Sequence, residues 1–150
     1  MKENLVIENE ILIKASSDVI WDILINPDKT KEYMYGCEVK CDWNPGDSIL
    51  WIGSTDDITY VKGNLIELDP KKRMVYTVID PSGDYPDIPE NYLSVSYDLI
   101  PEGDAIRFRI SQGDYSKVAD GEKRYKDSAE AGGWQSVLEK IKEMAEATSS

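Results

Sequence analysis

The stretch LSVSYDLIPEGDAIRFRI, residues 93–110, carries the clearest structural pattern in the chain. Apolar side chains alternate with serine and aspartate in its first half, and with Arg107 and Arg109 in its second half. The residues between the two halves, Pro-Glu-Gly-Asp at 101–104, are typical of a turn. A period of two on both sides of a turn predicts an antiparallel hairpin with one apolar face and one polar face.

The same period of two extends back toward the N-terminus. In residues 37–43, for example, Cys37, Val39, Cys41 and Trp43 would share one face of a strand. The expected strands are residues 5–14, 37–43, 48–54, 59–68, 73–79, 93–99 and 106–110. Six successive strands joined mostly by short turns are expected to be antiparallel.

Two segments have a helical period instead. After the capping sequence Ser16-Ser17-Asp18, apolar residues recur at helical spacing until Pro27 ends the helix. Near the C-terminus, one long amphipathic helix is expected from about Asp120 to Ala147. The apolar face of the sheet needs a cover, and only this helix is long enough to provide it. The pattern therefore predicts an α+β fold, with a curved antiparallel sheet of about six or seven strands wrapped around a C-terminal helix.

Length and composition limit the function of the chain. Its 150 residues are expected to form a single domain, 1–150. A net charge of −12 disfavours binding to nucleic acid or to an anionic membrane surface. The absence of histidine excludes Ser-His-Asp, Cys-His and histidine–metal sites, and no metal ion or cofactor is expected. Two acidic groups, Asp56-Asp57 and the loop group Asp84, Asp87 and Glu90, lack the spacing of a calcium loop and are interpreted as solvated surface.

The two cysteines and the N-terminus are typical of a reducing compartment. In an extended strand Cys37 and Cys41 would lie about 13 Å apart, which is too far for a disulfide. Two buried free thiols are expected, and a metal site that recruits carboxylates is the alternative. The N-terminal residues lack the apolar core of a signal peptide, and no apolar run has the length of a membrane span. A soluble cytoplasmic protein is the resulting expectation.

Four segments resemble the family named for activators of the heat-shock protein 90 ATPase. They are ASSDVIWDIL at 15–24, WNPGD at 43–47, GNLIELDP at 63–70 with RMVYT at 73–77, and GWQSVL at 133–138 followed by Ile141-Lys142. Together these segments span roughly residues 5–145, in the order in which the family has them. The resemblance implies the helix-grip fold of the START-like superfamily, which also includes the birch-pollen allergen.

The resemblance leaves three functions open. The wider superfamily mostly binds apolar small molecules beneath the long helix, so binding of an apolar or amphipathic ligand is the first hypothesis. A protein-interaction module related to the chaperone activators is the second, and a cyclase- or hydrolase-type enzyme is the third, without any assigned catalytic residue. Many bacterial single-domain members have no known activity. The eukaryotic activators carry an additional domain before this one, so direct stimulation of a chaperone ATPase is not expected here.

Large aromatic residues on the inward face of the strands or on the covering helix are the candidate ligand-binding residues. They are Trp51, Tyr60, Tyr76, Tyr97, Phe108 and Trp134. Ligand sites combine apolar walls with a few polar groups, and indole and phenol side chains supply both. The alternative is that these residues pack the core. Gly132 and Gly133 weaken a helix, which predicts a bend or a close approach to the sheet beside Trp134.

Overall fold

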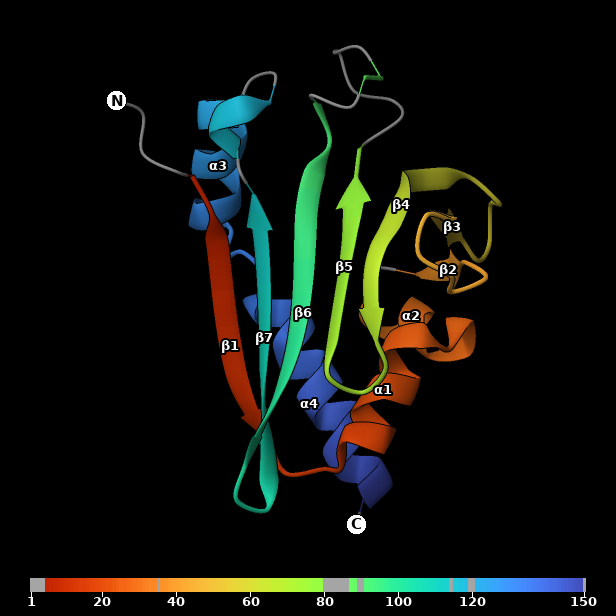
Figure 1. Ribbon diagram of the computed structural model, residues 1–150, viewed down its shortest axis with the longest axis vertical. Coiled ribbons are helices and arrows are strands. Elements are labelled where there is room, and N and C mark those ends of the chain that lie inside the picture. Colours follow the sequence, from red (N-terminus) through yellow and green to blue (C-terminus); the bar gives the residue numbers. More distant parts are fainter. Residues whose placement is uncertain are drawn as a thin grey trace.

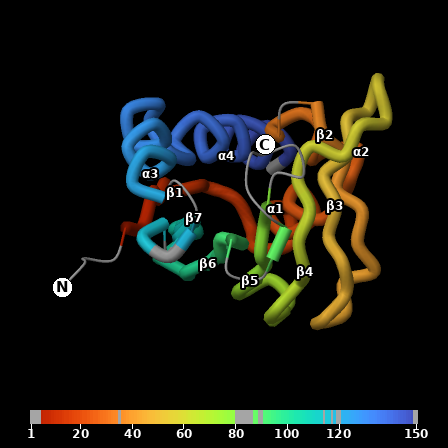
Figure 2. The backbone as a smooth tube through the Cα atoms, turned by 90° about the horizontal axis from the view of Figure 1, so that it is seen from above, coloured from red at the N-terminus to blue at the C-terminus, as the bar shows by residue number. Residues whose placement is uncertain are grey.

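The fold is built on a curved antiparallel sheet, with the helices on its concave side (Figures 1 and 2). The computed structural model describes residues 5–34, 36–79, 87–88, 91–113, 115–118 and 121–149. The strands in these ranges are β1 (Ile7–Ile13), β2 (Cys37–Lys40), β3 (Ser48–Gly53), β4 (Thr59–Asp69), β5 (Arg73–Val78), β6 (Leu93–Glu102) and β7 (Ala105–Gly113). Their order across the sheet is β1-β7-β6-β5-β4-β3-β2. This architecture confirms the predicted α+β helix-grip fold.

The hairpin predicted from residues 93–110 is formed by β6 and β7. Leu99 lies directly opposite Phe108 in the antiparallel register of this hairpin. On its other side β7 pairs with β1, where Ile7 lies opposite Gln112. The first strand of the chain therefore lies beside the last one (Figure 1).

The first N-terminal helix forms where the sequence predicts it, and a second, shorter helix begins at Pro27. Helix α1 spans Ser17–Ile25, and the Ser16 hydroxyl caps it by accepting a hydrogen bond from the Val19 amide at 3.3 Å. Helix α2 spans Pro27–Tyr33, and the Asn26 side chain caps its first turn. Among the described residues, no helix has both the length and the apolar composition needed to cross a lipid bilayer.

The C-terminal segment differs from the prediction of one continuous helix, which is wrong. It forms two helices, α3 (Gly121–Glu130) and α4 (Gln135–Ser149). Gly132 and Gly133 separate them with φ angles of +93° and +60°, a left-handed conformation that favours glycine. A Cβ atom on Gly133 would lie 2.6 Å from Oδ1 of Asn9, so the chain passes too close to β1 for a side chain.

One strand boundary also differs from expectation. Strand β2 ends at Lys40 rather than at residue 43, because Trp43 turns the chain with a left-handed φ of +64°. A short 3-10 helix, η2 (Tyr115–Lys117), follows β7. The expected helix start at Asp120 lies outside the described residues, as does most of the irregular segment 80–91.

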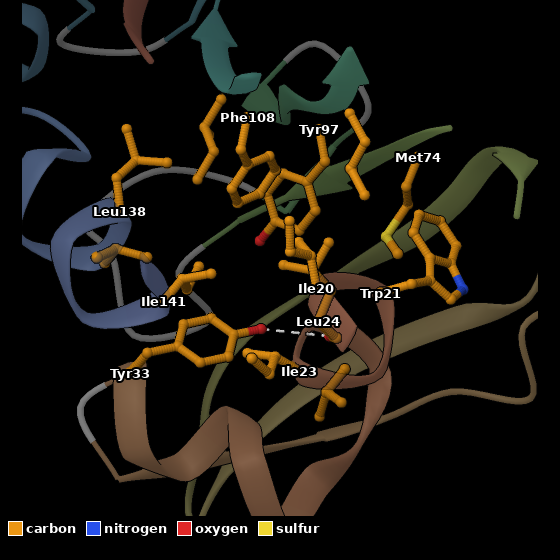
Figure 3. Packing of buried hydrophobic residues seen from close by; sticks show 14 of the residues in the cluster. Ile20, Trp21, Ile23, Leu24, Tyr33, Met74, Tyr97, Phe108, Leu138 and Ile141 are labelled. Carbon is orange, nitrogen blue, oxygen red and sulfur yellow. Dashed lines mark hydrogen bonds between the residues drawn. The ribbon is translucent and has the colours of Figure 1, made fainter. Parts of the chain in front are cut away.

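The core lies between the sheet and the pair α1 and α4 (Figure 3). Ile20 and Leu24 of α1 face Leu138 and Ile141 of α4, and Phe108 reaches into the same cluster from β7. All five side chains are fully buried. Dense packing of this kind fixes how α4 crosses the sheet, and with it the position of the junction between α3 and α4.

Candidate functional site

A pocket of about 640 Å³ lies on the concave face of the sheet, beside the junction of α3 and α4. Its aliphatic wall is formed by Ile7, Met34, Val61, Val78, Val95 and Val137. Its aromatic wall is formed by Trp51, Tyr60, Tyr76, Tyr115 and Trp134. Polar atoms come from Cys37, Gln112 and Ser128. None of the described residues that line the pocket is a lysine, arginine, aspartate or glutamate.

The floor of the pocket is one row of residues that runs across four strands. Ile7 of β1 lies opposite Gln112 of β7, Gln112 lies opposite Val95 of β6, and Val95 lies opposite Tyr76 of β5. Residues in direct register on adjacent strands point to the same face of the sheet, so all four side chains face the pocket. The sheet register therefore builds this floor from segments that are far apart in the sequence.

Four of the six predicted ligand-binding residues line the pocket, namely Trp51, Tyr60, Tyr76 and Trp134. The remaining two, Tyr97 and Phe108, do not. Tyr97 comes two residues after Val95 on β6, and Phe108 comes four residues before Gln112 on β7, so both lie beyond the floor row. They are only 1% and 0% exposed and pack in the core beside α1 and α4 (Figure 3).

A chain of aromatic rings connects the pocket to the core. The ring centroids are 6.1 Å apart from Trp51 to Tyr76, 5.3 Å from Tyr76 to Tyr97, and 5.7 Å from Tyr97 to Phe108. The Tyr76 and Tyr97 hydroxyl oxygens are 2.6 Å apart and share a hydrogen bond. Burial raises the pKa of both phenols, so both stay protonated near neutral pH and are poor general bases.

Trp134 forms the end of the pocket next to α3. Its indole Nε1 donates a hydrogen bond to Oε1 of Gln112 at 3.1 Å, and its backbone amide donates one to Oδ1 of Asn9 at 3.0 Å. Both partners lie on the sheet, in β7 and β1. The sharp turn at Gly133 allows this attachment, and the indole remains half-buried rather than fully packed.

Tyr60 and Cys37 form the opposite end of the pocket, where β2, β3 and β4 meet. Tyr60 is 46% exposed, and its hydroxyl donates a hydrogen bond to Oδ2 of Asp56 at 2.5 Å. This hydrogen bond, together with that from the Ile58 amide, lowers the pKa of Asp56. Burial raises the pKa of the Cys37 thiol, and the nearby Asp56 charge raises it further. This end of the pocket therefore combines a neutral thiol with an ionised carboxylate at the rim.

The two cysteines are free, as predicted. Cys37 is buried, whereas Cys41 is half-buried because it lies beyond the end of β2. The described ranges contain no grouping of three or more cysteine, aspartate or glutamate side chains that could hold a metal ion. Asp84 and Glu90 lie outside the described residues, and Asp87 forms an ion pair with Lys62.

Comparison of the sequence with known protein families gives one match. Residues 14–146 match the family described as activator of Hsp90 ATPase homolog 1-like protein. The chain belongs to this family. A comparison with curated protein sequences finds no match.

Solved structures with the same fold match between 82% and 99% of this Hsp90 ATPase activator-like chain. ChR145 from Cytophaga hutchinsonii is 28% identical with a TM-score of 0.74, and the match covers 99% of this chain and 98% of that one. The Aha1 dimer from Colwellia psychrerythraea is 17% identical with a TM-score of 0.69, covering 94% and 96%. PFC0360w, an HSP90 activator from Plasmodium falciparum, is 10% identical with a TM-score of 0.60, covering 82% and 86%. The identities of the last two support a shared fold alone.

In this family member, several pocket residues were missed by the sequence prediction. Gln112 lies on the last strand, but its role depends on cross-strand register with Ile7 and Val95, which a single sequence does not show. Ser128 enters the lining because the break in the C-terminal helix sets the position of α3. Met34, at the end of α2, carried no sequence signal at all.

Proposed function

We propose that this domain binds a small apolar or amphipathic molecule in the pocket between the sheet and the α3–α4 junction. The observation that carries the proposal is a pocket of about 640 Å³ whose wall is mainly aliphatic and aromatic. Pockets of roughly 300–1,000 Å³ with such walls and a few placed polar groups are typical of small-molecule sites. Membership of an activator-like family with a START-like fold supports the same function.

The polar groups of the wall suit an amphipathic ligand. The Gln112 side chain uses its oxygen to accept the indole hydrogen bond of Trp134, and its amide group carries two N–H donors. The Ser128 hydroxyl and the Tyr60 hydroxyl lie at opposite ends of the pocket. A ligand with one polar end and an apolar body would satisfy such a wall while burying its apolar surface.

Two measurements test the proposal. Native mass spectrometry of protein purified without denaturation should show a co-purifying small molecule. A variant that retains only Trp134, with the other three tryptophans changed to Phe, should show a saturable emission change on titration with fatty alcohols, sterols or flat aromatic compounds. The matched control retains only Trp43, which does not line the pocket, and its emission should not change. The absence of any response in the Trp134 variant would contradict the proposal.

A chaperone contact is the second candidate function, because the family is described by Hsp90 ATPase activation and one similar structure is called an HSP90 activator. The steady-state ATPase rate of an Hsp90-type chaperone, measured with and without this protein, tests it. Stimulation that persists when a ligand fills the pocket would favour the protein-interaction function over the pocket.

A further inference from the structure

Because Gly53 has no side chain, it leaves space for the Asp56 carboxylate on the concave face of the sheet. It follows Trp51 by two positions on β3, so a side chain there would point to the same face as Trp51. A Cβ atom on Gly53 would lie 2.1 Å from Oδ1 of Asp56 and 2.9 Å from Cε2 of Tyr60. The Asp56 carboxylate and the Tyr60 ring therefore occupy the space that a side chain at Gly53 would fill, at the end of the pocket.

The turn between β3 and β4 holds the Asp56 carboxylate in this place. Its Oδ1 accepts a hydrogen bond from the Ile58 amide at 3.0 Å, and its Oδ2 accepts one from the Tyr60 hydroxyl. Asp57 supports the tight turn with a left-handed φ of +58°, which is uncommon outside glycine. Because the hydrogen bonds lower the pKa of Asp56, its negative charge persists at neutral pH.

Among the described residues of the wall, an anionic ligand would find no comparable partner. None of the described lining residues is a lysine or an arginine. Lys62, the neighbour of the lining residue Val61, is already paired with Asp87. The basic residues of α3 lie near the opposite end of the pocket and outside its lining. The net charge of −12 further favours the approach of cations.

We propose that the pocket selects an amphipathic amine, whose apolar body lies on the floor row and whose ammonium group lies beside Trp51 and Tyr60, next to Asp56. This inference rests on the proposed function of the pocket. An ammonium group near aromatic faces gains cation–π attraction, and near a carboxylate it gains Coulomb attraction. A carboxylate on the same apolar body would meet Asp56 as a like charge.

Three ligands that share one alkyl chain isolate the charge of the polar end: n-decylammonium, n-decanol and n-decanoate. Isothermal titration calorimetry at pH 7 and low ionic strength, below the micelle concentration of each compound, gives their affinities. We expect n-decylammonium to bind roughly fivefold more tightly than n-decanol, and n-decanoate to bind more weakly than n-decanol. Added salt should reduce the difference, since the carboxylate is at the rim.

Two variants with the same net charge test the role of Asp56. The substitution Asp56→Asn removes the charge at the pocket, and Asp104→Asn removes one charge in the turn of the β6–β7 hairpin. Asp104 adjoins the Glu102–Ala105 end of the register, whereas Val95 and Gln112 of the pocket floor lie at the other end. The amine preference should disappear in Asp56→Asn and persist in Asp104→Asn. Thermal unfolding of both variants confirms that each is folded before titration.

The outcomes separate this inference from the function on which it rests. Binding of n-decanoate as tight as that of n-decylammonium would overturn amine selection and leave the pocket function standing. An equal response of Asp56→Asn and Asp104→Asn would overturn the assignment to Asp56 in the same way. If none of the three compounds binds the unsubstituted protein, the ligand-binding function itself is contradicted.

Discussion

The two ends of the concave face are built from the same strands but differ in how they are filled. Toward the β6–β7 turn, Tyr97 and Phe108 pack against α1 and α4 and leave no access to solvent (Figure 3). Toward the other end of the strands, beside α3, a pocket of about 640 Å³ remains between aromatic walls. The difference comes from the covering helices: α4 carries a buried apolar stripe, whereas Gly121 is the only buried residue of α3. An apolar strand face therefore becomes core or pocket according to the helix that covers it.

The largest expected effect is at the filled end. Phe108→Ala should lower the free energy of unfolding by about 3–5 kcal/mol, because it leaves a cavity among side chains that are held by both helices. Urea unfolding at constant m-value measures the loss. Ile66→Ala is the matched control, since Ile66 is 53% exposed and should change stability by less than about 0.5 kcal/mol. A small loss for Phe108→Ala would mean that this end is not tightly packed.

The next effect is at the pocket end. Trp134→Ala should lower the free energy of unfolding by about 2 kcal/mol, less than Phe108→Ala, because the indole is half-buried and borders the pocket. Part of this loss is the hydrogen bond to Gln112, which Trp134→Phe removes while it keeps an aromatic ring. The same urea unfolding experiment applies. A loss for Trp134→Ala equal to that for Phe108→Ala would show that the two ends are packed alike.

Between the two ends, the Tyr76–Tyr97 hydroxyl pair gives a smaller effect. Either Tyr76→Phe or Tyr97→Phe should lower the free energy of unfolding by about 1 kcal/mol, because the remaining buried hydroxyl loses its partner. The double substitution should cost no more than one single substitution, since no unpaired hydroxyl remains. A double-mutant cycle in urea measures this coupling. Additive losses would indicate that the two hydroxyls do not interact.

The smallest effect concerns reactivity rather than stability. In a Cys41→Ser variant, Cys37 should react slowly with a thiol reagent at pH 8, because burial and then the Asp56 charge raise its pKa and little thiolate is present. The rate should increase as the pH rises, and saturating n-decanol should slow it, since Cys37 lines the pocket. In the matched Cys37→Ser variant, the half-buried Cys41 should react faster. Equal rates for the two thiols would contradict the burial of Cys37, and a rate unchanged by n-decanol would place Cys37 outside the pocket.

The fold was predictable because its determinants are local. Alternation in residues 93–110, the turn at 101–104 and the cap at Ser16 each act within a few residues, and the structure reproduces all three. The glycine pair Gly132 and Gly133 was also visible as a weak point. Its full effect was not, because the helix breaks only where the backbone must pass close to β1.

The position of the pocket was not predictable in the same way. Alternation identifies which residues face inward, and Val95, Tyr97 and Leu99 have identical signals in the sequence. Of these three residues, only Val95 lines the pocket. Long-range packing decides which positions of the strand α4 covers and which lie beside α3, and a single sequence does not show this packing. The sequence therefore predicts Tyr97 and Phe108 as site residues from their aromatic chemistry and their inward strand face. In the structure, apolar side chains of the helices cover both.

The pairing of β1 with β7 has a consequence for the time at which the protein can fold. Ile7 finds its partner Gln112 only after 105 further positions have been synthesised. At roughly 5–20 residues per second, about 5–20 s of translation therefore pass between the synthesis of β1 and that of its neighbour β7. The long loop must also close against its entropy before this pairing gives any stabilisation. A chain that stops before β7 contains the neighbouring strands β2 to β6, yet its first strand has no partner in the sheet.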